Sequence, residues 1–270
     1  MLVANAVGFV YIALVGLLVG SFLNVCILRI PAGEGIITAP SHCPRCNRKL
    51  RFYELIPLFS WLFQKGRCRG CGCKISAQYP IVEASNALLW VLCAAVVGFA
   101  DFSILHLLRL TLQCAVLSAL FGLAVIDART GEIPFGFNIF IGVLGAVNLA
   151  AILLQTNFTA VLEQLLLHGI GFFAISLPLY AIYLITGRRA IGGGDIKLLA
   201  AAGLFLGWRL IVLGFFVACV VGSLIHVLRM RFANAGRELK LGPYLAGGIG
   251  FAMLFGDALI NLYMTSIRGF

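Results

Sequence analysis

Two pairs of cysteines are the residues with the most definite chemistry in this sequence. Cys43 and Cys46 form one CxxC pair, and Cys68 and Cys71 form a second pair after a spacer of 21 residues. Two residues between cysteines let a tight turn direct both thiolates at one ion, and four thiolates match the tetrahedral coordination of Zn²⁺. The pattern therefore predicts a zinc site. It is expected to be structural, because four cysteine ligands leave no position open for a water.

Two alternatives accompany the zinc interpretation. Cys73 competes with Cys71 for the fourth ligand position, and Cys71 is preferred because it keeps the CxxC spacing. The same cysteines could instead form two disulfides or a redox-active dithiol, and the cellular compartment decides between these possibilities.

Two aspartates are candidates for acid–base chemistry. Asp127 directly follows the uncharged run 110–126, and Asp195 follows three glycines, Gly192 to Gly194, just ahead of another apolar run. Two carboxylates that share a site cannot both ionise easily, so one keeps a proton. One acid can then deprotonate a water while the other polarises a carbonyl, which is the chemistry of an aspartic protease. Either residue alone could equally be a loop or helix-cap residue.

The composition determines what kind of protein must position these residues. The chain has 270 residues, of which 61% are apolar and 11% charged, and its mean hydropathy is +1.05. Soluble domains are about 45–50% apolar and about 25% charged. The composition therefore excludes a soluble globular enzyme and a free nucleic-acid-binding domain, and it indicates a protein that crosses the lipid bilayer several times.

Uncharged runs mark the expected membrane spans. Helices are expected, because only helices and closed barrels satisfy the backbone polar groups in lipid. The sequence predicts an all-α polytopic membrane protein with about eight transmembrane helices, of which the sixth is short. The eight runs are 1–28, 84–100, 110–126, 133–162, 164–187, 198–208, 210–228 and 241–256. Three regions are expected: a first transmembrane helix over 1–28, a four-cysteine zinc module over 29–82 and a helical protease core over 83–270.

The basic residues predict the orientation of the chain. If residue 1 lies outside, the loops 29–82, 127–134, 187–197 and 229–242 lie inside and hold 17 of the 20 Lys and Arg residues. Such an excess is typical of cytoplasmic loops. Both aspartates and the cysteine module are then cytoplasmic, where thiols stay reduced, which disfavours disulfides. The net charge of +10 is thereby explained without nucleic acid, and nothing in the sequence indicates an oligomeric state.

The helix ends suggest different roles for the acids. Asp195 is expected at a helix N-terminus, which favours its charged form, and Asp127 at a helix C-terminus, which disfavours it. Asp195 would then be ionised and Asp127 protonated. Asp257 interrupts the last run nearer the outer side and is interpreted as a structural residue.

Several short motifs, in this order, resemble those of the type IV prepilin peptidases, which are bacterial inner-membrane leader peptidases of the GxGD aspartyl protease group. They are Gly20-Ser21-Phe22-Leu23-Asn24-Val25 with Arg29-Ile30-Pro31, Cys43-Pro-Arg-Cys46, Pro57-x-x-Ser60-Trp61-Leu62, Cys68-Arg-Gly-Cys71, Tyr79-Pro80-Ile-Val-Glu83, Asp127 with Ile133-Pro134, Gly192-Gly193-Gly194-Asp195-Ile196-Lys197-Leu198 and Gly242-Pro243-Tyr244-Leu245-Ala246.

The resemblance implies a function. It implies that Asp127 and Asp195 form a catalytic dyad that removes the short basic leader of type IV prepilins and of the pseudopilins of type II secretion, at the cytoplasmic face of the inner membrane. Members with four cysteines usually also methylate the new N-terminus with S-adenosylmethionine, for which the sequence marks no binding residues. Because the cysteine module is basic, acids such as Glu34 or Glu54 are the candidates for binding the leader.

Two positions depart from the family pattern, and other functions stay open. Phe135 stands where the family commonly has a second Asp, and Leu241 stands where Phe often precedes Gly-Pro. The alternatives are a non-catalytic membrane scaffold and an ion or proton transporter that uses Asp127, Asp195 and Asp257. A presenilin-like protease ranks low, because the chain lacks the Pro-Ala-Leu triplet expected there.

Overall fold

A computed structural model of the chain describes residues 2–37, 40–98, 103–188, 191–233 and 240–268. Ten α-helices are described in these segments, together with a short 3-10 turn at Phe52–Glu54. The helices are α1 (Leu2–Arg29), α2 (Phe59–Phe63), α3 (Gln78–Val97), α4 (Ile104–Thr130), α5 (Phe135–Leu153), α6 (Phe158–Ala174), α7 (Ser176–Ile185), α8 (Gly193–Leu206), α9 (Trp208–Ala233) and α10 (Gly242–Arg268). The chain divides into two compact units, Met1–Phe102 and Ser103–Phe270.

Seven helical stretches of the described residues are long and apolar enough to cross a membrane. They correspond to seven of the eight expected runs, and one of them contains α6 and α7 together, over Phe158–Ile185. α7 begins as a separate helix because Pro178 has no N–H to continue the hydrogen-bonding pattern of α6. The remaining run, 198–208, lies in α8, which has only 14 residues, so the expectation of a short sixth helix is confirmed.

The boundary between the fourth and fifth expected spans was misplaced by the sequence interpretation. It was set at Glu163, the charged residue that divides the runs, whereas α5 ends at Leu153 and α6 begins at Phe158, so that Glu163 lies inside α6. The break falls at the polar segment 154–157, where Asn157 has the extended backbone of a residue that precedes a helix. A criterion based on charge alone does not detect such an uncharged polar break.

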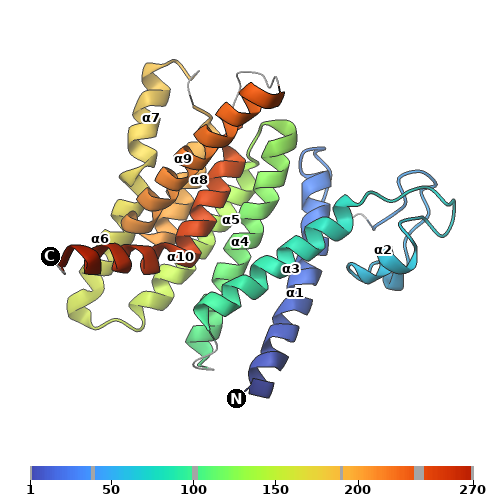
Figure 1. Cartoon of the computed structure of the whole chain (residues 1–270), viewed down its shortest axis with the longest axis horizontal. Coiled ribbons are helices and arrows are strands. Elements are labelled where there is room, and N and C mark those ends of the chain that lie inside the picture. Colours follow the sequence, from blue (N-terminus) through green and yellow to red (C-terminus); the bar gives the residue numbers. More distant parts are fainter. Residues whose placement is uncertain (1, 38–39, 99–102, 189–190, 234–239, 269–270) are drawn as a thin grey trace. The chain divides into compact units, whose positions relative to one another are not determined.

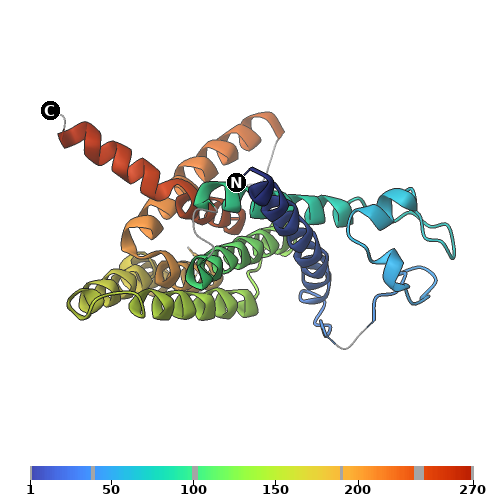
Figure 2. The ribbon, with the colours of Figure 1, turned by 90° about the horizontal axis from the view of Figure 1, so that it is seen from below.

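In the first unit, α1 and α3 lie side by side (Figures 1 and 2). Two glycines on α1 allow this close approach, because a Cβ on Gly20 would lie 2.8 Å from the Cα of Glu83. The carbonyl of Gly16 accepts a hydrogen bond of 2.7 Å from the buried amide of Asn86. In both views the irregular segment between the two helices, which contains α2, extends beyond the pair.

α8 is the most enclosed helix of the second unit. It packs against α5, α6, α7, α9 and α10, and nine of its 14 residues are buried. At 1.5 Å per residue it is about 21 Å long, which is shorter than the roughly 30 Å thickness of the hydrocarbon core. Non-helical backbone at membrane depth is tolerated where protein surrounds it, and the neighbouring helices provide that environment.

The contact between α6 and α8 depends on a pair of glycines whose backbones touch. A Cβ on Gly171 would collide with the carbonyl oxygen of Gly203, and a Cβ on Gly203 would collide with that of Gly171. Small residues at such crossings let the backbones of membrane helices approach closely. This contact fixes the position of the helix that carries Asp195.

We expect Gly171→Ala to lower the melting temperature of the protein in detergent, because overpacking of this kind costs about 1–3 kcal/mol. Gly169→Ala is the matched control on α6, since among the described residues nothing lies within 4 Å of a Cβ at that position. The control is expected to melt at or slightly above the temperature of the unchanged protein. Equal melting temperatures for the two variants would contradict the proposed role of the contact.

Candidate active site and metal centre

Both CxxC pairs lie in turns of the same construction. In the first turn the N–H of Cys43 donates to the carbonyl of Arg48, and in the second the N–H of Cys68 donates to the carbonyl of Cys73. Each turn is closed by an antiparallel bridge, between His42 and Lys49 or between Arg67 and Lys74. Matching positions in the two turns are 25 residues apart in the sequence, so one backbone pattern presents two thiols from each turn.

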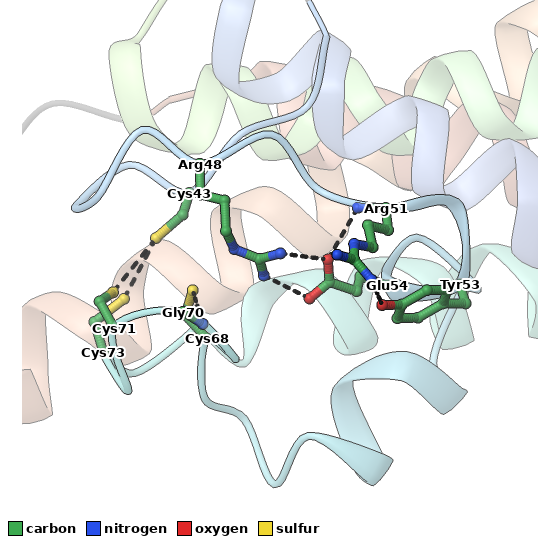
Figure 3. A network of polar contacts seen from close by, with 9 residues as sticks. All are labelled: Cys43, Arg48, Arg51, Tyr53, Glu54, Cys68, Gly70, Cys71 and Cys73. Atoms are coloured by element: carbon green, nitrogen blue, oxygen red, sulfur yellow. Dashed lines mark hydrogen bonds and ion pairs between the residues drawn. The ribbon is translucent and has the colours of Figure 1, made fainter.

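The two turns bring the four expected cysteines together. The sulfurs of Cys43, Cys46, Cys68 and Cys71 all lie within 4.8 Å of one another. The Sγ atoms of Cys43 and Cys71 are 3.9 Å apart (Figure 3), and sulfurs at about 2.3 Å from a tetrahedral zinc ion are separated by roughly 3.8 Å. The donor set and its spacing therefore fit a zinc ion.

Backbone N–H groups prepare two of these thiols for metal binding. The N–H groups of Cys46 and Arg45 lower the pKa of the Cys43 thiol to about 6. The N–H groups of Cys71 and Gly70 likewise lower the pKa of the Cys68 thiol. The first cysteine of each pair is thus biased toward the thiolate, which is the form that binds a metal.

A fifth thiol lies close to the same cluster. The Sγ of Cys73 is 3.6 Å from that of Cys43, so distance alone does not exclude Cys73 as a ligand. The repeated backbone pattern separates the candidates, because Cys71 occupies the position that matches Cys46, whereas Cys73 occupies the position that matches Arg48. The geometry thus favours Cys71, as the CxxC spacing predicts.

Glu54 is not available to bind a basic leader. Its side chain is 1% exposed, and the Arg48 guanidinium donates to both carboxylate oxygens, at 2.7 and 3.1 Å (Figure 3). Arg48 also holds the pKa of this carboxyl below its ordinary value. The hypothesis that Glu54 receives the substrate leader is wrong for this reason, whereas Glu34 is exposed. Arg48 lies against Gly70 of the second turn, so the ion pair also joins the two turns.

Asp127 lies in the last turn of α4, where the first residue of α10 covers its carboxyl group. The N–H of Gly242 is hydrogen-bonded to the carboxylate, and a Cβ on Gly242 would lie 2.6 Å from Oδ2. The side chain is buried, and this oxygen has no hydrogen-bond partner among the described residues. Lys240 donates to the carbonyls of Ala128 and Arg129 at 2.9 and 3.2 Å and so ties the start of α10 to the end of α4.

Asp195 lies in the first turn of α8, and glycines surround its carboxyl group as well. The N–H of Gly192 is hydrogen-bonded to the carboxylate, and a Cβ on Gly192 would lie 2.8 Å from Oδ2. A Cβ on Gly194 would lie 2.9 Å from the Cβ of Ile133. The amide of the buried Asn138 donates to the Gly194 carbonyl at 3.3 Å, so that α5 fixes the turn that carries Asp195.

The two carboxyl groups lie near enough for the charge of Asp127 to act on the carboxyl group of Asp195. Each carboxylate also accepts an N–H at the N-terminal end of a helix, Asp127 from α10 and Asp195 from α8. The expectation that only Asp195 benefits from a helix N-terminus is therefore wrong, because it considered only the helix to which each residue belongs. A site with two adjacent carboxyl groups can hold one proton between them.

The two units of the chain match two families in turn. Residues 14–97 match the Bacterial Peptidase A24 N-terminal domain, and residues 114–227 match the Type IV leader peptidase family. Similar proteins align over nearly the whole chain. One from Stutzerimonas stutzeri, named prepilin leader peptidase/N-methyltransferase, is 33% identical over 99% of this chain and 98% of its own. The chain belongs to the type IV leader peptidase family.

Further relatives carry the same name, prepilin leader peptidase/N-methyltransferase. The protein from Bacillus subtilis is 35% identical over 94% of this chain and 97% of its own length. The protein from Pseudomonas aeruginosa is 32% identical over 93% and 91%. No solved structure matches the chain.

One departure from the leader peptidase pattern has a structural counterpart. Phe135 is at the start of α5, and the ammonium of Lys197 lies 4.5 Å from the centre of its ring. A cation over an aromatic face is attracted by the electrons of the ring. Lys197 thus contacts an aromatic ring at the position where this family commonly has a carboxylate. The two candidate catalytic residues, Asp127 and Asp195, are both retained.

Sequence reasoning about this leader peptidase missed three residues that position the aspartates. The sequence marks Gly242 only as part of a motif and gives no role to Lys240 or Asn138. Gly242 and Lys240 act on a residue more than 110 positions away, so nothing local connects them with Asp127. For Asn138 a signal existed, because a polar amide in an apolar span is expected to have a specific partner.

We expect Gly242→Ala to reduce leader cleavage by about 10- to 100-fold, because a methyl group at this position would displace either the Asp127 carboxylate or the start of α10. Displacement of a reacting group by about 1 Å can cost about 100-fold in rate. Gly247→Ala on the same helix is the control, since a Cβ there has open space among the described residues. The measurement is the rate of leader removal in proteoliposomes. Equal rates for the two variants would refute the role assigned to Gly242.

Proposed function

We propose that this chain is a membrane aspartic endopeptidase that removes the basic leader of type IV prepilins and pseudopilins at the cytoplasmic face of the bacterial inner membrane. The observation that carries the proposal is the electrostatic interaction between two carboxyl groups at the ends of α4 and α8, Asp127 and Asp195, in a chain of the leader peptidase family. The names of the relatives support the same function.

The proposed chemistry uses the two carboxyl groups in complementary forms. The ionised carboxylate removes a proton from a water, which attacks the carbonyl carbon of the scissile bond, while the protonated partner donates its proton to the carbonyl oxygen. The resulting gem-diol collapses when the leaving nitrogen takes up a proton. The C–N bond then breaks, and the products are the leader with a free carboxyl group and the pilin with a free amine.

The glycines at the site let the chain's own backbone approach the carboxyl groups closely. Gly192 and Gly242 each place a backbone without a side chain against an aspartate. Only a residue without a Cβ allows so close an approach. The free Oδ2 of Asp127 is the acceptor that we assign to the attacking water or to the proton shared by the pair.

The proposed orientation rests on charge. Seventeen of the 20 Lys and Arg residues fall in the four segments that the sequence assigns to one side of the membrane, and such an excess is expected for the cytoplasmic side. Asp127 and Asp195 lie at the helix ends next to two of these loops. The cleavage site of a prepilin lies where its basic leader meets its apolar helix. The two aspartates and this cleavage site are therefore expected at the same membrane depth.

We further propose that Cys43, Cys46, Cys68 and Cys71 hold a structural zinc ion and that the enzyme methylates the new N-terminus. When bound, zinc would cross-link the two turns of the module, and all its ligands would be thiolates. S-adenosylmethionine would supply the methyl group, which passes from its sulfonium to the lone pair of the amine. The spacing of the thiols supports the metal, and the names of the relatives support the methyl transfer.

A transporter is the less favoured alternative, because it needs acids distributed across the membrane. Asp257 lies 15 residues beyond Gly242 on α10, which is about 22 Å along the helix. It is exposed, whereas Asp127 and Asp195 lie together. Two adjacent carboxyl groups at one depth suit hydrolysis better than conduction.

Asp127→Asn and Asp195→Asn are each expected to lower leader cleavage by about 10²–10⁴-fold, the usual contribution of a general acid or base. Asp257→Asn is the control and is expected to retain full cleavage. Purified variants in liposomes are mixed with a prepilin, and the product mass is followed with and without S-adenosylmethionine. Normal cleavage by either variant of the pair would exclude the dyad. An added mass of one methyl group in the unchanged protein would establish the second activity.

Replacement of Cys71 by Ser is expected to abolish stoichiometric zinc binding, because the fourth thiolate of the tetrahedral set is lost. Cys73→Ser is the matched control, with the same chemical change two residues away, and is expected to keep about one zinc ion per chain. Elemental analysis of the purified variants measures the difference. Loss of zinc in the Cys73 variant and retention in the Cys71 variant would assign the fourth ligand to Cys73.

A further inference from the structure

The cysteine module exposes a group of large apolar side chains outside the membrane spans. Phe52 is 82% exposed and Phe63 is 79% exposed. The other members come from α2 and the residues just before it, and α2 packs against the 3-10 turn that begins with Phe52. We call this group the apolar surface of the module, and it consists of Phe52, Leu55, Ile56, Phe59, Leu62 and Phe63.

These side chains do not build the interior of the module. Trp61, in the middle of α2, packs its ring against Gly66 and donates from its indole to the carbonyl of Ile75 at 3.2 Å. The same short helix thus turns one aromatic residue inward and leaves Phe59, Leu62 and Phe63 outside. Exposed apolar groups of this size mark a surface that is covered by another apolar phase or molecule.

A buried carboxylate fixes the depth of this surface relative to the bilayer. The N–H of Leu58, in the middle of the apolar surface, donates to Oε2 of Glu83 at 2.6 Å. Glu83 is only five residues inside α3, which begins at Gln78 and is a candidate membrane span. Five residues of helix are about 7.5 Å. The segment that carries the apolar side chains is therefore held at the level where α3 enters the membrane.

The charges around the apolar surface indicate the kind of lipid. Region 29–82 contains nine Lys and Arg residues and two acids, and one of these acids, Glu54, is already paired with Arg48. The exposed Arg51 precedes Phe52, and the exposed Lys65 follows Phe63 by two residues. Aromatic and aliphatic side chains flanked by Lys and Arg are typical of segments that lie in the headgroup region of anionic membranes.

We propose that the segment Phe52–Phe63 inserts its apolar side chains into an anionic lipid surface beside the end of α3. The exposed Arg51 and Lys65, which flank this segment, then contact lipid headgroups. A second copy of the chain, residues 103–270 of the same chain or a prepilin would be the alternative occupants of this surface. The proposal does not depend on peptidase activity.

The test places the photoreactive amino acid p-benzoylphenylalanine at residue 63 of the full chain. The protein is reconstituted in nanodiscs of phosphatidylethanolamine and phosphatidylglycerol and irradiated, and the adducts are identified by mass spectrometry. The matched control carries the same group at Lys49, which is exposed in the module but outside the apolar surface. We expect at least about five times more lipid adduct at residue 63 than at residue 49.

Three results would overturn the proposal. Equal lipid labelling at the two positions would show that the apolar surface is not in the bilayer. Cross-links from residue 63 to residues 103–270, to a second copy or to an added prepilin, in place of lipid adducts, would assign the surface to that occupant. Lipid labelling that is unchanged when phosphatidylcholine replaces both lipids would remove the anionic specificity. Zinc content measured on the same samples verifies that the module is folded.

Discussion

A helix that is too short to cross a bilayer alone carries one of the two aspartates, and the surrounding helices must therefore provide its environment. α8 is buried among five neighbours, and its backbone touches that of α6 at Gly171 and Gly203. Because five helices pack against α8, this short helix can remain among them without exposing its backbone polar groups to lipid. Asp195 consequently occupies a defined position, which a flexible loop would not provide.

The same principle of close backbone approach recurs at each carboxyl group. Gly242 touches Asp127 and Gly192 touches Asp195, and in each case the N–H of that glycine is hydrogen-bonded to the carboxylate. Preorganised donors of this kind stabilise negative charge without any reorganisation during the reaction. Any side chain larger than hydrogen at these two positions would collide with the carboxylate beside it.

Local sequence patterns predicted the chemical groups of this protein, but not the contacts that position them. The CxxC spacing identified the cluster of four thiols, because each turn is built from a few consecutive residues. The short apolar run likewise identified α8. In contrast, the contact of Gly242 with Asp127 joins segments 115 residues apart, and it depends on how α10 packs against α4. The burial of Glu54 beside Arg48 was equally hidden, because both residues are of types that are usually exposed. The break at 154–157 was missed because its polar residues are uncharged.

The hydrogen bond between Leu58 and Glu83 connects two parts of the first unit that differ in their source of stability. The four thiols of the cysteine turns are suited to a metal that would hold the turns together, whereas α1 and α3 are held by packing and by buried amides such as Asn86. If the module unfolds, the Glu83 carboxylate loses the N–H of Leu58 and remains buried between the helices, which is costly. By thermodynamic linkage, a ligand that binds only the folded module also stabilises whatever depends on that fold. A metal bound at the four thiols would thereby also stabilise the pair of α1 and α3 within the bilayer.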